Sequence, residues 1–257
     1  MLKGLGGKEG SGKMAFDKKS IRAVIFDYGN TLVEFSRKQV VVCDAALADA
    51  LEKHFGKPDF EKLSALRDRD RLAPYAGDPP LYRENDLVEI TTAMIQELYG
   101  LDPSPEQLAE ILRARFEVFV RIVRAEPEVY GLLDRLAQRY RLGLLSNYPD
   151  GDAIRESLAK TGLDAYFKSV VVSADVHLVK PHPVPFLTIL DDLRVRADQA
   201  VLVGDNWVAD VQGGKRAGLH VVMLRRWETP EKLPRKPGDF EPDVTIGTLS
   251  ELEALLL

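Results

Sequence analysis

Asp27 follows an apolar run and opens a tight polar turn. The run from Ile21 to Phe26 is rich in β-branched residues, and Asp27 is followed by Tyr-Gly-Asn-Thr. This pattern predicts a buried parallel strand with a carboxylate at its carboxyl end. Ligands of open α/β sheets bind at that edge, so Asp27 is a candidate for chemistry there. The commoner role of a lone aspartate after a strand is to cap the next turn.

Three later segments have the same form, an apolar strand followed by polar residues. Residues 142–145 lead into Ser146 and Asn147, residues 169–172 lead toward Lys180, and residues 200–203 lead through Gly204 into Asp205 and Asp210. If the four predicted strands are parallel, their carboxyl ends meet at one crevice. That crevice then holds a hydroxyl, an ammonium and three carboxylates, which is more than a set of turn caps requires.

This set of residues resembles the haloacid dehalogenase-like hydrolase superfamily, most of whose members are Mg²⁺-dependent phosphatases. The resemblance runs from Ile21 to the C-terminus and is strong because the motifs occur together and in the family's order. It implies that Asp27, Ser146 and Lys180 are catalytic. It also implies that phosphate is bound by Thr31, Ser146, Asn147 and Lys180.

The same resemblance implies a mechanism. Asp27 attacks phosphorus and forms an aspartyl-phosphate, which is a form of covalent carboxylate catalysis. Magnesium is held by the carboxylates of Asp27 and Asp205 and by the main-chain oxygen of Gly29, in keeping with the preference of this ion for oxygen ligands. Asp210 does not bind the metal directly and instead holds a metal-bound water or Lys180. We therefore expect a small phosphorylated metabolite as the substrate.

Gly29 departs from the family pattern. Phosphatases of this type carry a second aspartate two residues after the nucleophile, which protonates the leaving oxygen and later activates water. Glycine has no side chain for either task, and such help is worth about 10² to 10⁴ in rate. Three explanations stand: substrates with good leaving groups, a substitute acid such as Glu34 or His182, or a retained fold with low turnover.

Two other functions compete with a phosphatase. Metal-independent dehalogenases use the same nucleophile on carbon and lack this second aspartate. A protein of this fold with low activity could instead serve as a binding module for a phosphorylated ligand. The Gly-Asp-x4-Asp pattern of Asp205 and Asp210 favours phosphate, because a metal-independent dehalogenase has no need of metal-binding acids.

The bulk composition excludes several classes of protein. Of the 257 residues, 45% are hydrophobic and 29% charged, which is typical of a soluble globular protein. The net charge of −5 gives no general affinity for nucleic acid or anionic membranes. The single cysteine, Cys43, excludes an intrachain disulfide and fits a cytoplasmic protein. No apolar run approaches the roughly 20 residues that span a bilayer. A monomer is compatible with this composition, which leaves the oligomeric state open.

The chain alternates between predicted strands and helices, with one helical interruption. Residues 21–35 and 126–257 predict a doubly wound parallel sheet of the α/β class, which forms the catalytic core. Residues 36–125 are helical throughout and resemble the all-α cap domain that many superfamily members insert after the nucleophile. Residues 1–20 are rich in glycine and lysine and lack periodicity, which predicts a flexible N-terminal tail.

The predicted cap offers candidate substrate contacts and two predicted buried stripes. Five of its residues have side chains suited to grip a substrate: Arg69, Arg71, Tyr75, Tyr82 and Arg83. Helical spacing predicts one buried stripe from Val41 to Phe55 and another from Leu108 to Val123.

Overall fold

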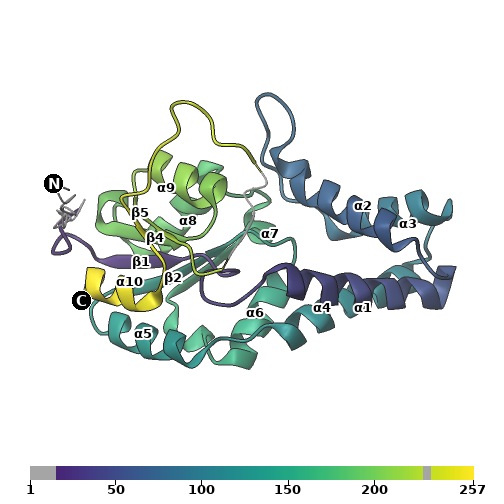
Figure 1. Cartoon of the computed structure of the whole chain (residues 1–257), viewed down its shortest axis with the longest axis horizontal. Coiled ribbons are helices and arrows are strands. Elements are labelled where there is room, and N and C mark those ends of the chain that lie inside the picture. The colour runs from purple at the N-terminus through teal and green to yellow at the C-terminus, as the bar shows by residue number, and fades with distance from the viewer. Residues whose placement is uncertain (1–15, 228–232) are drawn as a thin grey trace, which may run out of the picture.

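A computed structural model describes residues 16–227 and 233–257. Its centre is a six-stranded sheet of parallel strands in the order β3-β2-β1-β4-β5-β6 (Figure 1). The strands are β1 (Ala23–Phe26), β2 (Arg141–Ser146), β3 (Ser169–Val172), β4 (Ala200–Gly204), β5 (His220–Leu224) and β6 (Val244–Ile246). The predicted α/β class with a doubly wound parallel sheet is confirmed.

Strand β1 lies in the middle of this sheet. All four of its residues are buried, which agrees with a β-branched and aromatic strand covered on both faces. Phe26 pairs in register with Leu144 of β2 on one side and with Val203 of β4 on the other. The residues that follow these three strands therefore meet at one edge, with Asp27 between the other two.

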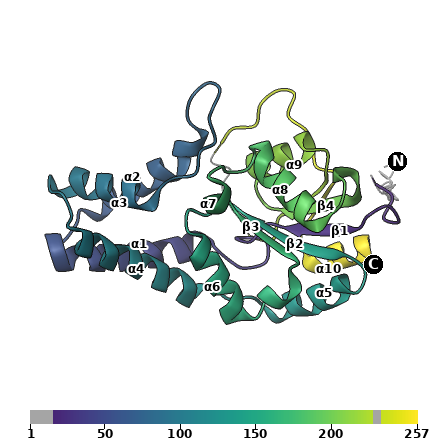
Figure 2. The ribbon, with the colours of Figure 1, turned by 180° about the vertical axis from the view of Figure 1, so that it is seen from behind.

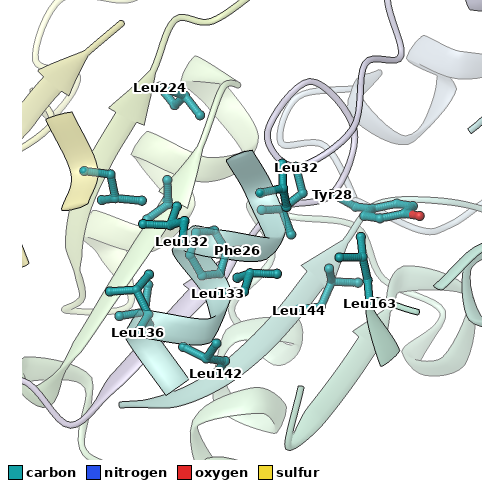
Figure 3. Packing of buried hydrophobic residues seen from close by; sticks show 14 of the residues in the cluster. Phe26, Tyr28, Leu32, Leu132, Leu133, Leu136, Leu142, Leu144, Leu163 and Leu224 are labelled. Carbon is teal, nitrogen blue, oxygen red and sulfur yellow. The ribbon is translucent and has the colours of Figure 1, made fainter. Parts of the chain in front are cut away.

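Helices cover both faces of the sheet (Figure 2). One face carries α5 (Pro127–Ala137), α6 (Gly151–Thr161) and α10 (Leu249–Leu256), and the other carries α8 (Pro183–Leu193) and α9 (Gly213–Arg216). On the first face Phe26 packs among leucines that include Leu132 and Leu142 (Figure 3). The buried Tyr28 hydroxyl lies 2.9 Å from the Ser157 hydroxyl of α6, so that the turn after β1 is fixed to this layer.

Two adjacent glycines allow α9 to approach the sheet closely. A Cβ at Gly213 would lie 2.5 Å from the Phe186 ring, and one at Gly214 would lie 2.8 Å from Val221 of β5. Glycine lowers the stability of a helix, and the close packing that these two glycines permit compensates for that loss.

Helices α1 (Arg37–Phe55), α2 (Phe60–Leu72), α3 (Leu87–Tyr99) and α4 (Pro105–Ile122) form a lobe beside the carboxyl edge of the sheet (Figure 1). The lobe has its own hydrophobic cluster, which includes Leu47, Leu63, Met94, Ile95 and Ile111. The short helix η1 (Ala73–Tyr75) follows α2, and α7 (Ser173–Val176) follows β3.

The inward faces of α1 and α4 differ from the predicted stripes. Val41 is 44% exposed, whereas Asp44 is buried. On α4 the buried residues are Ile111, Val118 and Phe119, and much of the predicted stripe is only half-buried. Leu51 of the predicted α1 stripe is buried, but the inward series of α1 also contains the charged Asp44, which apolar spacing alone did not include.

The structure shortens the predicted N-terminal tail on its described side. Phe16 is buried and lies 4.8 Å, ring to ring, from His220, and Ser20 closes a turn on Asp17. Residues 1–15 of the predicted tail lie outside the described residues. Among the described residues, no helix combines the length and the apolar character that crossing a membrane requires.

Candidate active site

Lys180 is buried between two carboxylates at the carboxyl edge of the sheet. Its ammonium nitrogen lies 2.8 Å from Asp27 Oδ1 and 2.7 Å from Asp210 Oδ1, and it donates a third hydrogen bond to the Leu145 carbonyl at 2.8 Å. The side chain of Lys180 is 1% exposed. All three of its protons therefore have acceptors, which is the condition for burying an ammonium without a large penalty.

The charges of this cluster shift one another's protonation. Burial raises the pKa of Asp27 to about 6, against the lowering effect of the Lys180 ammonium. Burial alone would lower the pKa of Lys180, but the carboxylates of Asp210 and Asp27 outweigh it and raise that pKa. The two carboxylates thus favour the ammonium form of Lys180, and Lys180 opposes the rise in the pKa of Asp27 that burial causes.

A wide helical turn carries Asp210 back to the lysine. The π-helix η4 (Trp207–Gln212) directly precedes α9, and the Asn206 side chain caps its first N–H groups. Asp210 Oδ2 accepts from the Asn206 backbone N–H at 2.9 Å. A Cβ at Gly204 would lie 2.4 Å from the Asp210 carboxylate, so this approach requires glycine at position 204.

The residues expected to bind phosphate lie in different positions. Ser146 is at the end of β2, 5% exposed, and lines the cavity above the sheet edge. Thr31 is fully buried and donates to Asp27 Oδ2 at 3.3 Å, and it is not among the cavity-lining residues. The Asn147 amide holds the backbone of Lys180, since Asn147 Oδ1 accepts from Lys180 N at 2.8 Å and Nδ2 donates to the Lys180 carbonyl at 3.0 Å.

The donors expected for magnesium lie together. Asp27, Asp205 and Asp210 present carboxylate oxygens within 4.8 Å of one another. Both Asp210 oxygens are already held, one by Lys180 and one by the Asn206 N–H, whereas Asp205 is half-buried beside the cavity. Among the described residues, no backbone N–H donates to the Gly29 carbonyl. Hard oxygen donors in this number suit a magnesium ion that retains several waters.

Gly29 has room for a side chain. A Cβ there would meet only the Phe35 Cβ, at 3.5 Å, which is ordinary contact, and its backbone does not have a positive φ. The proposed substitutes for the absent acid have other partners. Glu34 accepts from the Ser36 hydroxyl at 2.7 Å, His182 caps the start of α8 through its ring nitrogen, and neither lines the cavity.

A cavity of about 350 Å³ lies between the sheet edge and the helical lobe. The sheet edge contributes the charged residues described above, and the lobe contributes apolar residues such as Leu47, Met94, Val118 and Phe119. Of the cap residues predicted to grip a substrate, Arg71 and Tyr75 line this cavity. Arg69 instead pairs with Asp70 and Glu97, and neither Tyr82 nor Arg83 lines the cavity.

Sequence reasoning missed a group of charged residues on the lobe side of the cavity, namely Asp44 of α1, Arg67 and Asp70 of α2, and Arg115 of α4. Arg67 Nε lies 2.7 Å from Asp44 Oδ1. The sequence did contain a sign of this group, because these charged residues interrupt helical series that are otherwise apolar. Such interruptions mark positions where packing alone does not determine the residue type.

The segment between η1 and α3 docks on the loop that carries Lys180. The Tyr75 hydroxyl donates to the Lys180 carbonyl at 3.1 Å, and the backbone N–H of Val179 donates to the Tyr82 carbonyl at 2.8 Å. Glu84, which lines the cavity, accepts from the Ser173 hydroxyl of α7. Burial raises the pKa of Glu84. The lobe and the sheet edge are therefore joined directly at the loop that carries Lys180.

Comparisons with known proteins agree with this geometry. The family model described as haloacid dehalogenase-like hydrolase matches residues 24–224. The glyceraldehyde 3-phosphate phosphatase of Methanopyrus kandleri is 28% identical over 236 residues, which cover 90% of this chain and 95% of that protein. The phosphoglycolate phosphatase of Rhodospirillum rubrum is 32% identical over 212 residues, 79% of each chain.

A solved structure is similar over nearly the whole chain. The 2-haloacid dehalogenase from Pseudomonas syringae pv. Tomato DC3000 superimposes with a TM-score of 0.69 at 27% identity, covering 92% of this chain and 98% of that one. The family match contains the Asp27, Ser146, Lys180 and Asp205 positions that the resemblance singled out. The chain belongs to the haloacid dehalogenase-like hydrolase family.

Proposed function

We propose that this hydrolase is a Mg²⁺-dependent phosphatase of small phosphorylated metabolites that works through an aspartyl-phosphate at Asp27. The observation that carries the proposal is the charge set at the sheet edge, where three carboxylates lie together and one ammonium contacts two of them. Negative charge is in excess there, so a phosphate dianion would be repelled unless a cation accompanied it. Both curated relatives named above are phosphatases.

Each residue then has a chemical task. The Asp27 carboxylate attacks phosphorus, the bond to the leaving oxygen breaks, and the phosphoryl group is held as a mixed anhydride until water releases it. Lys180 is already aligned on Asp27 and can neutralise a phosphoryl oxygen without moving far. Ser146 is placed to donate to another phosphoryl oxygen. Thr31 and Asn147 position Asp27 and Lys180.

Bound magnesium would supply charge neutralisation between the anionic nucleophile and the anionic substrate. Asp27, Asp205 and the Gly29 carbonyl would hold it. Asp210 supports Lys180, because both of its oxygens are in use. The helical lobe formed by residues 36–125 serves as the cap that encloses the substrate, since it supplies the far wall of the cavity.

A dehalogenase is the second candidate, and Gly29 is the observation that favours it. Displacement of a halide from carbon needs no acid for the leaving group, and Gly29 provides none. A solved dehalogenase is also similar in fold and sequence to this chain. The phosphatase is preferred because metal-independent chemistry does not require the cluster of carboxylate oxygens that Asp27, Asp205 and Asp210 form. Metal dependence separates the two functions.

Replacement of Asp27 by asparagine tests the nucleophile. We expect Asp27→Asn to retain less than a few percent of wild-type phosphatase turnover, because an amide does not attack phosphorus. The amide oxygen still accepts from Lys180, so the fold is retained, as thermal melting will show. In ¹⁹F NMR, beryllium fluoride with Mg²⁺ should form a complex with the wild type and none with the variant. Appreciable turnover by a folded variant would contradict the covalent mechanism.

Removal of magnesium tests the metal. Treatment with EDTA should abolish hydrolysis of p-nitrophenyl phosphate, and added Mg²⁺ should restore it. Asp205→Asn should raise the Mg²⁺ concentration needed for half-maximal activity at least tenfold with little change in melting temperature. Asp198→Asn, an exposed aspartate paired with Arg196, is the matched control and should behave as the wild type. Full activity after metal removal would instead favour the dehalogenase.

Restoring an acid at position 29 tests the meaning of the glycine. Wild-type turnover should fall steeply as the pKa of the leaving alcohol rises, so that aryl phosphates are preferred over alkyl phosphates. Gly29→Asp has space for its Cβ and should raise activity on alkyl phosphates, up to about 10²- to 10⁴-fold. The matched control is Gly29→Asn, whose side chain has the same shape as that of Gly29→Asp but carries no acidic proton. It should give no gain in activity on alkyl phosphates. Equal wild-type rates on alkyl and aryl phosphates would show that another group donates the proton.

Replacement of Lys180 tests the buried charge cluster. In EDTA at pH 7, Lys180→Met should lower the free energy of unfolding by about 3–5 kcal/mol, because it leaves Asp27 and Asp210 buried without a cation. The pKa of Asp27 should rise above 6, since the lysine lowers it. The folded variant then binds protons more tightly than the unfolded chain, so the deficit should shrink as pH falls from 7 to 5.

Urea unfolding at the two pH values measures this deficit. Lys215→Met removes a cation from a less buried pair with Asp243 and should cost less, which makes it the matched control. A loss that is the same at pH 5 and pH 7 would contradict this account of the cluster.

A further inference from the structure

Three arginines line the lobe side of the cavity, and they differ in their partners. Arg67 is compensated, with Nε 2.7 Å from Asp44 Oδ1 and a second nitrogen 2.8 Å from Asp68 Oδ1. Arg71 is exposed. Arg115 is half-buried, and no hydrogen bond or ion pair joins it to another of the described residues. Within the part of the chain that the structure describes, it is therefore a cation that lines the cavity without a paired carboxylate.

The position of Arg115 on α4 directs it toward the catalytic edge. Arg115 precedes Phe119 by four residues, so the two share one face of the helix. The Phe119 ring stacks on Tyr148 at 4.4 Å, and Tyr148 follows Ser146 by two residues. The charge of Arg115 acts on both Tyr148 and Cys43 of α1, where it lowers pKa values that burial raises. The guanidinium thus lies between the lobe and the loop after β2.

A guanidinium in this setting is suited to an anion of the ligand. Taking it partly out of water costs free energy, and no ion pair with a carboxylate of residues 16–227 or 233–257 offsets that cost. Near it on α4, Val118 and Phe119 add only apolar surface to the cavity. A ligand carboxylate can accept two parallel hydrogen bonds from the planar guanidinium, and its single charge matches that of one arginine.

We propose that Arg115 binds a carboxylate of the substrate on the lobe side of the cavity, which makes phosphorylated carboxylic acids the preferred substrate class. This inference rests on the phosphatase function proposed above and adds to it a residue that determines specificity. Arg67 is paired with Asp44 and Arg71 is exposed, which leaves Arg115 as the half-buried arginine available for this role.

The test compares two substrates that differ only in the remote group. 3-Phosphoglycerate carries a carboxylate where glycerol 3-phosphate carries a hydroxymethyl group, and both have alkyl leaving oxygens. The absence of an acid at Gly29 therefore slows both alike, and the ratio of their kcat/KM values isolates the carboxylate. With Mg²⁺, the wild type should prefer 3-phosphoglycerate by about 10- to 100-fold, the factor expected for hydrogen bonds to a charged group.

Substitutions of arginine assign this preference to one side chain. Arg115→Gln should remove the preference through a higher KM for 3-phosphoglycerate, and Arg115→Lys should retain part of it, because it keeps the charge and loses the paired hydrogen bonds. Arg113→Gln alters an exposed arginine two residues away that does not line the cavity, and it should keep the wild-type ratio. Thermal melting checks that each variant is folded.

The possible results distinguish a failure of the carboxylate inference from a failure of the proposed phosphatase function. A wild type that hydrolyses p-nitrophenyl phosphate but does not prefer 3-phosphoglycerate overturns the inference and leaves the phosphatase in place. A preference that survives in folded Arg115→Gln overturns the assignment to Arg115. A wild type that hydrolyses none of these three compounds with Mg²⁺ overturns the proposed function, and the inference with it.

Discussion

The ammonium of Lys180, buried between Asp27 and Asp210, is the interaction on which the geometry of the sheet edge depends. A buried cation is tolerable only when its protons have acceptors, so the chain around it must deliver two carboxylates and a carbonyl to one point. That demand accounts for Gly204, where any side chain would collide with the Asp210 carboxylate. It also accounts for the wide turn after Asn206, which brings Asp210 inward and places Asp205 beside the cavity.

The same lysine links the two parts of the molecule. Its backbone is held by the Asn147 amide on the sheet side and by the Tyr75 hydroxyl on the lobe side, and these two groups also hydrogen-bond to each other at 3.0 Å. Any movement of the lobe that withdraws Tyr75 therefore acts on the loop that carries Lys180. Enclosure of a substrate and alignment of Lys180 are in this way coupled through a few polar contacts.

The residues of the sheet edge could be predicted from the sequence because each of them follows a pattern that is visible in the neighbouring residues alone. An apolar strand followed by a polar turn marks Asp27, Ser146 and Asp205 without any knowledge of tertiary structure, and parallel pairing then brings them together. The lobe was predicted less well. Asp44 is buried on a helix whose predicted stripe did not include it, because its charge made that position read as polar. Arg115 went unnoticed on α4 for the same reason. Residues that serve a ligand break the apolar pattern from which burial is inferred.

Two glycines at the sheet edge illustrate how a structural demand differs from a chemical one. Gly204 is required by packing, since a Cβ would lie 2.4 Å from Asp210. Gly29 is not, because its backbone has no positive φ and a Cβ would meet only ordinary contact with Phe35. The fold would accept an aspartate at position 29, so neither packing nor backbone geometry accounts for the absence of the acid. A substrate whose leaving oxygen departs without a proton needs no acid there, and its selection then depends on binding. On this view the specificity of the enzyme is carried by the lobe side of the cavity, where Arg115 has no protein counter-ion among the described residues.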